Sequence, residues 1–532
     1  MKKILSVLLA SFLMVGCSDD FLDKQPIGAI TSSELLNSKE ACELALHNIY
    51  ATSMKSYTQY WTPMFDEARA DQIGYMPNSG SSLLNVFDYK QGLADNGAGY
   101  AFWLDGYNVI NACNKIISEE LVGIKEQEVR DDYIAQAKTM RAKIYLDLLN
   151  AFSIPVHNNA TENMGVPVVT EVDYHYYPVR AKVIENYQLI IDDLLFAVNH
   201  LQHDIQPEIV NQAFAHGLLT RVYMNLAGPI GSTTTYNLTI GNKTSITSDE
   251  ALQEAIKSAN RVLSIVQPNN NWSGLQFGVA RILDETIFAS ISNQEDNGWT
   301  GTSYYCAQWD SRTTVSQTVR MYTELVDKFA ADDLRRKYFY DYGNWYDYYE
   351  VYEAAGLDYL TASRKEVVKS EIRDLGGHRI FGKFAPKDFQ LNSLDDFLEY
   401  PNEEVEYTQG FGDYNLMRAS EIALLKAEAC MRSGDASNAL EAYKSVVSRY
   451  RPSLAISTVT LNDILRQKEL EFIGEGLRMR DLLRWGQDFS RPESSTTLVK
   501  DVKLTDYHMQ LPIPDGDIKV NENLDQNPGY GK

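Results

Sequence analysis

The chain has 532 residues, of which 44% are apolar and 23% are charged, so it is long enough to bury a large core and too polar for a protein with many membrane spans. Its 72 acidic residues exceed its 49 basic residues, which gives a formal net charge of -23 and excludes nucleic acid as a partner, because the phosphate backbone would be repelled. The 33 Tyr, 7 Trp and 19 Phe are a high aromatic content, and this excess is the first indication of function.

Residues 1–16 have the pattern of a secretion signal. Lys2 and Lys3 precede an apolar run that is too short to span a bilayer permanently and ends at Gly16, directly before Cys17. This end resembles the lipobox of bacterial lipoproteins, where the chain is cut before the cysteine and acylated on it, for example with palmitate. Several acyl chains on one residue anchor a protein stably. We therefore expect a mature chain that begins at Cys17 and is held to a membrane by lipid.

The residues after Cys17 indicate where the lipoprotein resides. Ser18, Asp19 and Asp20 resemble the acidic signal that Bacteroidetes lipoproteins use to reach the outer face of the outer membrane. A Gram-negative, cell-surface location is therefore our expectation, and an inward-facing periplasmic lipoprotein is the alternative.

Apolar residues recur at helical spacing along much of the chain. The segments are 33–51, 100–121, 129–152, 183–201, 210–226 and 249–266. The segment 423–452 resembles a tetratricopeptide hairpin, with small or aromatic residues at the packing positions Ala427, Cys430, Ala439 and Tyr443 and a turn at Gly434. We expect a mostly helical fold in which stacked helix pairs form a tetratricopeptide-like superhelix.

The residue pattern changes from helical periodicity between residues 267 and 417. Here strand-like runs such as 285–291 alternate with loops rich in Gly, Asn, Asp and Tyr. We therefore divide the chain into a signal peptide (1–16), an N-terminal helical part (17–266), a loop-rich part with minor β structure that binds ligand (267–417), and C-terminal helices with a tail (418–532). Since the two helical parts need each other to bury their apolar faces, we expect one interleaved body.

Six stretches, in order along the chain, resemble the SusD/RagB family of surface nutrient-binding lipoproteins. They are Arg141 and Ala142 with Tyr145, Leu149 and Pro155; Gly165–Val168; Leu325–Phe329 with Asp333, Arg335 and Arg336; Ala419–Glu421 with Ala427–Ala429; Arg466–Glu471 with Glu475, Gly476, Arg478, Asp481, Leu482 and Arg484–Gly486; and Leu511–Pro514 with Asn521, Leu524 and Gln526–Tyr530. The chain departs from the family pattern at Gln467 and Lys468, where Glu-Arg is common.

The resemblance implies a helical fold with tetratricopeptide units beside a loop-rich ligand face, and it implies binding rather than catalysis. It also implies a glycan as ligand, although some members bind peptides, and a SusC-like, TonB-dependent outer-membrane barrel as partner. We expect no cofactor, and a structural calcium ion stays open. At helical spacing, Arg478, Asp481 and Arg484 indicate a buried ion network rather than a ligand site.

A sugar is recognised by flat rings that cover its C–H faces and by polar groups that bond its hydroxyls, so aromatic segments are the candidate ligand contacts. The segment 297–310 supplies Trp299, Tyr304, Tyr305, Trp309 and Asp310, and Asn293 lies nearby in sequence. The segment 338–352 holds nine aromatic residues, among them Trp345 and Tyr346, and its alternative is a hairpin with one buried face. The segment 61–78 supplies Trp61, Arg69, Asp71 and Tyr75, and its alternative is a turn that packs on the helices.

Other residues favour structural roles. Trp103 and Trp485 lie on apolar helical stripes and are predicted core residues, as are the thiols of Cys42, Cys113 and Cys430. His200, His203 and Asp204 could bind a metal, although a polar helix end is the favoured interpretation.

The chain contains no G-x-S-x-G, H-E-x-x-H or Walker A pattern, and sequence alone does not show the carboxylate separation that glycoside hydrolysis requires. Three hypotheses therefore stand. The first is a glycan-binding surface lipoprotein, the second is the same architecture with a peptide ligand, and the third is a surface glycoside hydrolase.

Overall fold

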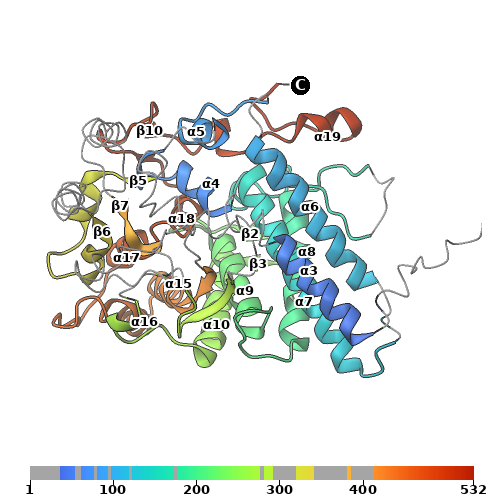
Figure 1. Ribbon diagram of the computed structural model, residues 1–532, viewed down its shortest axis with the longest axis horizontal. Coiled ribbons are helices and arrows are strands. Elements are labelled where there is room, and N and C mark those ends of the chain that lie inside the picture. Colours follow the sequence, from blue (N-terminus) through green and yellow to red (C-terminus); the bar gives the residue numbers. More distant parts are fainter. Residues whose placement is uncertain are drawn as a thin grey trace, which may run out of the picture.

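The computed structural model describes residues 38–53, 62–76, 81–93, 97–118, 123–171, 177–275, 281–291, 319–340, 380–384 and 413–531, together with residues 36, 121 and 279. The predicted signal peptide and the lipidation site at Cys17 lie outside these ranges. Within them the chain is mostly helical, with small sheets between the helices (Figure 1).

The helices lie close to where the apolar periodicity predicts them. Their bounds are α3 Lys39–Thr52, α4 Thr62–Arg69, α5 Ser81–Phe87, α6 Gly97–Ser118, α7 Gln127–Phe152, α8 Val183–His200, α9 Gln212–Ala227, α10 Ser248–Ile265, α15 Ala419–Arg432, α16 Ala436–Val447, α17 Leu461–Glu471, α18 Arg478–Trp485 and α19 Asp515–Val520. The six helices predicted in the first half are α3 and α6 to α10, which confirms those predictions.

Helices that follow one another in sequence pack side by side. α6 packs on α7, α7 on α8, α8 on α9, α9 on α10, and α10 on α15, so the last helices continue the array that the first helices begin (Figure 1). One apolar cluster reaches from Leu36 to Leu524 and draws residues from the helices and from the loop-rich part between them. Because the cluster is shared, each part buries its apolar face against another part.

The predicted tetratricopeptide hairpin is formed by α15 and α16. Its turn is at Gly434, whose φ of 82° lies in the left-handed region that a side chain disfavours. The two helices share a small buried cluster with α17, made of Ala427, Cys430, Ala439, Ala442 and Ile464. Small side chains at these positions let the helix axes approach closely. Their spacing is therefore the feature of the sequence that predicts the hairpin.

Short polar residues start several helices and tie them to their neighbours. Thr247 and Glu250 form a capping box at α10, in which each side chain bonds the other residue's backbone N–H. Asn211 caps α9 by accepting a 2.9 Å hydrogen bond from the backbone N–H of Phe214. Its Nδ2 donates over 2.9 Å to the carbonyl of Ile287, so the same residue holds a strand against the start of α9.

The strands form antiparallel pairs: β1 Ile73–Tyr75 with β5 Arg320–Met321, β2 Thr235–Tyr236 with β3 Ile246–Thr247, β4 Thr286–Ser290 with β8 Tyr414–Arg418, β6 Phe339–Tyr340 with β7 Ile380–Phe381, and β9 Phe489–Ser490 with β10 Asp501–Val502. β4 confirms the strand predicted at 285–291. The short 3-10 helices are η3 Trp272–Gly274, η5 Thr323–Lys328, η6 Leu334–Tyr338, η7 Gly382–Phe384 and η8 Tyr507–Met509.

The C-terminal tail closes over the end of α7. The backbone N–H of Leu511 donates to the carbonyl of Ala151 over 2.7 Å, and Asn527 Nδ2 donates to the carbonyl of Phe152 over 2.9 Å. Arg180 Nη1 donates to Asn527 Oδ1 over 2.9 Å. The first two bonds satisfy carbonyls that the end of α7 leaves without helical partners, and the third orients Asn527.

The predicted core residues are buried. Cys42, Cys113 and Cys430 are free thiols with no exposed surface, and Trp103 and Trp485 are 5% and 7% exposed. No helix in the described part of the chain has the length and apolar character needed to cross a bilayer.

Candidate functional site

The segments that hold most of the predicted ligand contacts begin and end on a set of small sheets. Residues 292–318 lie between β4 and β5, residues 341–379 between β6 and β7, and residues 385–412 between η7 and β8. The strands that flank them are paired with one another, as Ser290 with Tyr414 and Tyr340 with Ile380. β5 contacts β7 and pairs with β1, which places the end of the segment 61–78 on the same structure. We call β1, β4 to β8 and η7 the loop platform.

Most predicted ligand contacts lie outside the described residues and remain predictions: Trp61, Asn293, Trp299, Tyr304, Tyr305, Trp309, Asp310, Trp345 and Tyr346. Tyr75 is described. It ends β1 on the loop platform, its side chain is partly exposed, and its ring centroid lies 5.5 Å from the guanidinium carbon of Arg320 in β5.

The structure corrects the expectation that Arg69 and Asp71 contact ligand. Arg69 is fully buried, and it donates to the carbonyl of Met509 over 2.7 Å and to Asp66 Oδ1 over 2.6 Å. Asp71 is 7% exposed and accepts two bonds from Arg478, at 2.9 and 2.7 Å. Burial alone would raise the pKa of Asp71, but Arg478 lowers it below its ordinary value. Both residues join α4 and its following turn to the C-terminal part, which is the packing role that was the alternative for this segment.

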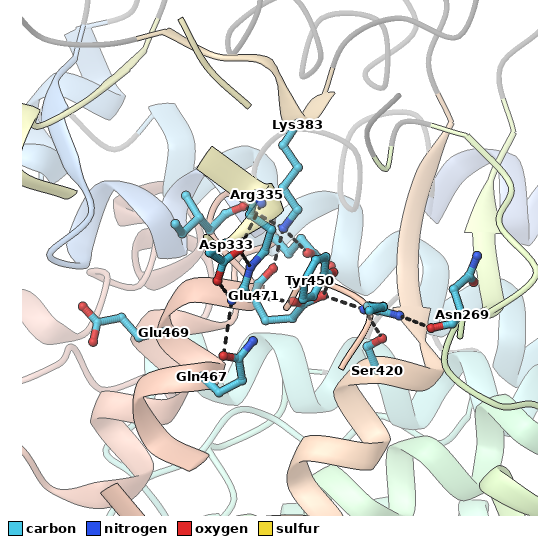
Figure 2. Close-up of polar contacts among 12 residues, drawn as sticks. Asn269, Asp333, Arg335, Lys383, Ser420, Tyr450, Gln467, Glu469 and Glu471 are labelled. Atoms are coloured by element: carbon cyan, nitrogen blue, oxygen red, sulfur yellow. Dashed lines mark hydrogen bonds and ion pairs between the residues drawn. The ribbon is translucent and has the colours of Figure 1, made fainter. Parts of the chain in front are cut away.

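A buried ion network holds the loop platform (Figure 2). We call it the Glu471 network. Its cations are Arg335, Lys383, Arg418 and Arg449, and its anions are Glu285, Asp333, Glu471 and Glu475. Asp333, Arg335, Glu471 and Glu475 were predicted only as parts of the family motifs. Asp333 and Arg335 lie in the charged run 332–337, so nothing local indicated that they are buried or which partners they bond.

Glu471, the last residue of α17, is the centre of the network. Its Oε1 accepts from Tyr450 OH at 2.8 Å and from Arg449 Nη2 at 2.9 Å, and its Oε2 accepts from Arg335 Nη1 at 3.0 Å. Burial alone would raise the pKa of Glu471, but Arg418, Arg449 and Arg335 lower it far below the ordinary value of a carboxyl group. The carboxylate is therefore ionised and committed to bonds inside the protein.

Lys383 connects η7 to the same network. Its Nζ donates to the carboxylate of Glu475 and, over 2.6 Å, to the carbonyl of Glu471. Arg418, the last residue of β8, also bonds Glu475 through its Nε at 2.8 Å. Lys383 lies between residues 341–379 and 385–412, so one buried ammonium group fixes the point at which the first of these segments ends and the second begins.

A second ion cluster surrounds Glu428 of α15. Its carboxylate accepts from Arg484 Nη1 at 2.5 Å and from Lys468 Nζ at 3.0 Å, and Trp485 Nε1 donates to it over 3.1 Å. Asp481 accepts from Lys468 at 2.6 Å and from Arg484 at 2.8 Å. This confirms the prediction that Asp481 and Arg484 belong to a buried ion network, and the pair of Asp71 with Arg478 extends the result to Arg478.

The Glu471 network suits a structural role, in which it fixes the loop platform, rather than proton transfer. The pKa values of Glu285, Glu471 and Glu475 are each lowered by cations against the effect of burial, so none of these carboxyls carries a proton at neutral pH. Two cavities beside α18 have volumes of about 40 and 30 Å³, which is room for a few water molecules at about 10–15 Å³ each and too little for a sugar ring.

No group of three or more His, Cys, Asp or Glu side chains in the described ranges is arranged to hold a metal ion. At the end of α8, His200 stacks on Phe196 with ring centroids 4.0 Å apart, and Asp204 pairs with Arg261 at 3.2 Å. These contacts fit the polar helix end that was favoured over a metal site.

Family models match both halves of the chain. Residues 284–530 match the model described as the SusD family, and residues 20–224 match the model described as "Starch-binding associating with outer membrane". A "SusD-like protein" of Bacteroides ovatus is 24% identical over 511 residues, which span 91% of this chain and 82% of the relative.

Solved structures share the fold. A SusD superfamily protein of Bacteroides thetaiotaomicron has a TM-score of 0.71 at 20% identity, and the match covers 92% of this chain and 99% of that chain. The "Surface glycan-binding protein A" of Bacteroides fluxus has a TM-score of 0.67 at 16% identity, covering 93% and 100%. Because SusD family models match residues 20–224 and 284–530, the chain belongs to the SusD family.

Proposed function

We propose that this protein is a lipid-anchored glycan-binding protein of the outer cell surface, which captures an oligosaccharide or polysaccharide and delivers it to a SusC-like, TonB-dependent transporter. The observation that carries the proposal is that the strands which flank the aromatic segments belong to one platform. The strands before and after residues 292–318, 341–379 and 385–412 are paired, and the Glu471 network joins β8 to the residue before β4.

A rigid base matters for sugar recognition because ordering loops and a flexible glycan both subtract from the binding free energy. Aromatic residues on fixed loops can present their rings to the C–H faces of a sugar, and each ring adds on the order of 1 kcal/mol beyond the area it buries. Binding in the micromolar to millimolar range is sufficient, since a tethered protein beside its transporter works at high effective concentration.

Relatives support the glycan as ligand and the surface as location. One matching family model is described as starch-binding and associated with the outer membrane, and one structure that shares the fold is a surface glycan-binding protein. The lipobox-like sequence before Cys17 and the acidic residues after it support a lipid anchor on the outer face.

The experiment is calorimetry of the full chain with a panel of polysaccharides and peptides, followed by chromatography of each binding ligand after long incubation. We expect at least one glycan to bind and to keep its length. Shortened products would contradict a binding protein and favour a hydrolase, and binding confined to peptides would contradict the glycan assignment.

Two further measurements address the anchor and the metal. Replacing Cys17 by Ser should release the protein from the membrane fraction, and an antibody should label the wild-type protein on intact cells. We expect no cofactor or metal, so a chelator should leave the unfolding midpoint unchanged. A fall of the midpoint that calcium reverses would instead show a structural calcium ion.

A further inference from the structure

A small cavity with six charged residues in its lining lies between α7, α9, α15, α17 and α18. It has a volume of about 40 Å³ and is lined by Leu146, Asn150, Arg221, Met224, Asn225, Glu421, Leu425, Lys468, Phe472, Leu477, Arg480, Asp481 and Arg484. We call it the Arg480 cavity. A second cavity of about 30 Å³ shares Asn150, Asn225, Arg480 and Arg484 with it, so the two adjoin. Cations outnumber anions in the lining of the Arg480 cavity by four to two.

Two arginines that line the cavity have hydrogen-bond donors that their ion pairs do not use. Arg221 bonds Glu421 through Nε and Nη2, both at 2.6 Å. Arg480 bonds Asp66 through Nε at 2.8 Å, and its Nη2 lies 3.1 Å from Asp147 Oδ1. Within the described structure, neither Nη1 atom bonds a protein acceptor. A guanidinium group has five N–H donors, so these two Nη1 groups are available to a molecule in the cavity.

The ion pairs around the cavity carry an excess of positive charge. Three cations, Arg432, Lys468 and Arg484, share Glu428 and Asp481, while Arg69, Lys143 and Arg480 share Asp66 and Asp147. Arg221 and Glu421 form a balanced pair. Glu67, which follows Asp66 in sequence, is mostly uncharged at neutral pH, because burial raises its pKa to about 8. The Glu471 network, in contrast, balances four cations with four anions.

Unbalanced charge inside a protein is unfavourable, because the interior screens it poorly and withholds the hydration that water would give. A small anion in the cavity would relieve this excess and accept the unused Nη1 donors. The volume excludes a sugar or a nucleotide, and the carboxylates of Glu421 and Asp481 in the same wall disfavour a multivalent anion.

We propose that the Arg480 cavity binds one small monovalent anion of the halide class, with chloride as the abundant candidate. The anion would lie among the donors of Arg221 from α9 and of Arg480 from α18. It would thereby join a helix of the first half of the chain to one of the last, and so stabilise the frame that carries the loop platform.

The test is urea unfolding of the full chain in chloride or bromide, with gluconate keeping ionic strength constant. Linkage predicts saturable stabilisation, with the unfolding equilibrium constant about tenfold lower at an anion concentration ten times its Kd. Arg221→Gln should abolish this halide response. Arg261→Gln removes the same charge from an arginine whose side chain is 46% exposed, and it should leave the response intact. No saturable halide effect in the wild type, or an undiminished one in folded Arg221→Gln, would overturn the proposal.

Crystals of the wild-type protein grown in bromide provide a second readout that needs no variant. We expect an anomalous scattering peak in the Arg480 cavity within hydrogen-bond distance of Arg221 and Arg480. A cavity that shows only water molecules at saturating bromide would overturn the proposal.

Discussion

Arg418 Nη1 donates to Glu285 Oε1 over 2.7 Å, although the two residues are 133 positions apart in the chain. Both side chains are almost completely buried, Glu285 just before β4 and Arg418 at the end of β8. This ion pair therefore joins the start and the end of the part of the chain that contains residues 292–318, 341–379 and 385–412. The Glu471 network fixes the ends of these segments, and the segments supply most of the predicted ligand contacts.

Removing Arg418 from this network should destabilise the protein strongly. Arg418→Met leaves Glu285, Glu471 and Glu475 buried with fewer cations, and breaking a buried ion pair in this way costs about 3–5 kcal/mol of unfolding free energy. Urea unfolding measures the difference. Arg261→Met breaks an exposed pair and should cost about 1 kcal/mol or less. Equal losses in the two variants would show that the network is not what stabilises the platform.

Lys383 should influence glycan binding as well as stability. Lys383→Met frees η7 from Glu475 and from the carbonyl of Glu471, so the adjoining segments lose their shared fixed point. We expect the Kd for a bound glycan to rise about tenfold or more, equivalent to about 1.4 kcal/mol, in calorimetry at a temperature where the variant is folded.

Lys468→Met is the matched control for Lys383. Lys468 is similarly buried and bonds two acceptors, where Lys383 bonds three, but it belongs to the Glu428 cluster. Its loss should lower stability and leave the glycan Kd within about twofold, a difference of about 0.4 kcal/mol. An equal effect of both variants on affinity would mean that general loosening, rather than the position of Lys383, weakens binding.

Glu67 should make stability depend on pH. Burial raises its pKa in the folded protein to about 8, above the ordinary value of 4.5, so the folded state holds a proton that the unfolded state releases between these values. The stability from this group is complete below about pH 4.5 and is lost as pH rises through about 8, with a slope of up to about 1.4 kcal/mol per pH unit.

Glu67→Gln should remove this slope and stabilise the protein at pH 7 to 9. The Gln oxygen can still accept the 2.8 Å bond from the backbone N–H of Gly476, and no proton has to be held. Urea unfolding of wild type and variant from pH 5 to 9 measures it. Parallel stability curves across that range would show that Glu67 does not titrate with a raised pKa.

Gly476 should not tolerate a side chain. Its φ is +70°, and a Cβ there would lie 2.7 Å from the Cα of Pro63 at the start of α4. Gly476→Ala should therefore cost about 2–4 kcal/mol from backbone strain and crowding together. Gly516→Ala is the control, because a Cβ at Gly516 meets nothing within 4 Å, and it should change stability by less than about 0.5 kcal/mol. A tolerated Gly476→Ala would mean that α4 can move away from residue 476.

The helical frame was predictable because its determinants are local. Apolar residues repeat at helical spacing through α8 and α10, and the small residues of α15 and α16 mark their close approach. The family motifs predicted the same frame, and the ion network expected at Asp481 and Arg484 is present.

The role of Arg69 was not predictable from its neighbours in sequence. It was predicted to contact ligand because it lies in a segment with aromatic and polar residues, but its acceptor on Met509 is 440 positions away. Asp71 is likewise 407 positions from its partner Arg478. The sequence around a polar residue does not indicate that the residue is buried when its partner is distant along the chain. The structure is needed to identify that partner. The Glu471 network escaped sequence analysis for the same reason.

Aromatic side chains of residues 292–318 should bind the glycan. Calorimetry or affinity electrophoresis with a glycan that binds the wild type should compare Trp299→Ala and Trp309→Ala with Tyr100→Ala, which removes a ring that is 49% exposed on α6. We expect each tryptophan variant to weaken binding about fivefold or more, about 1 kcal/mol per ring, and Tyr100→Ala to leave it unchanged. Wild-type affinity in both tryptophan variants would contradict the claim.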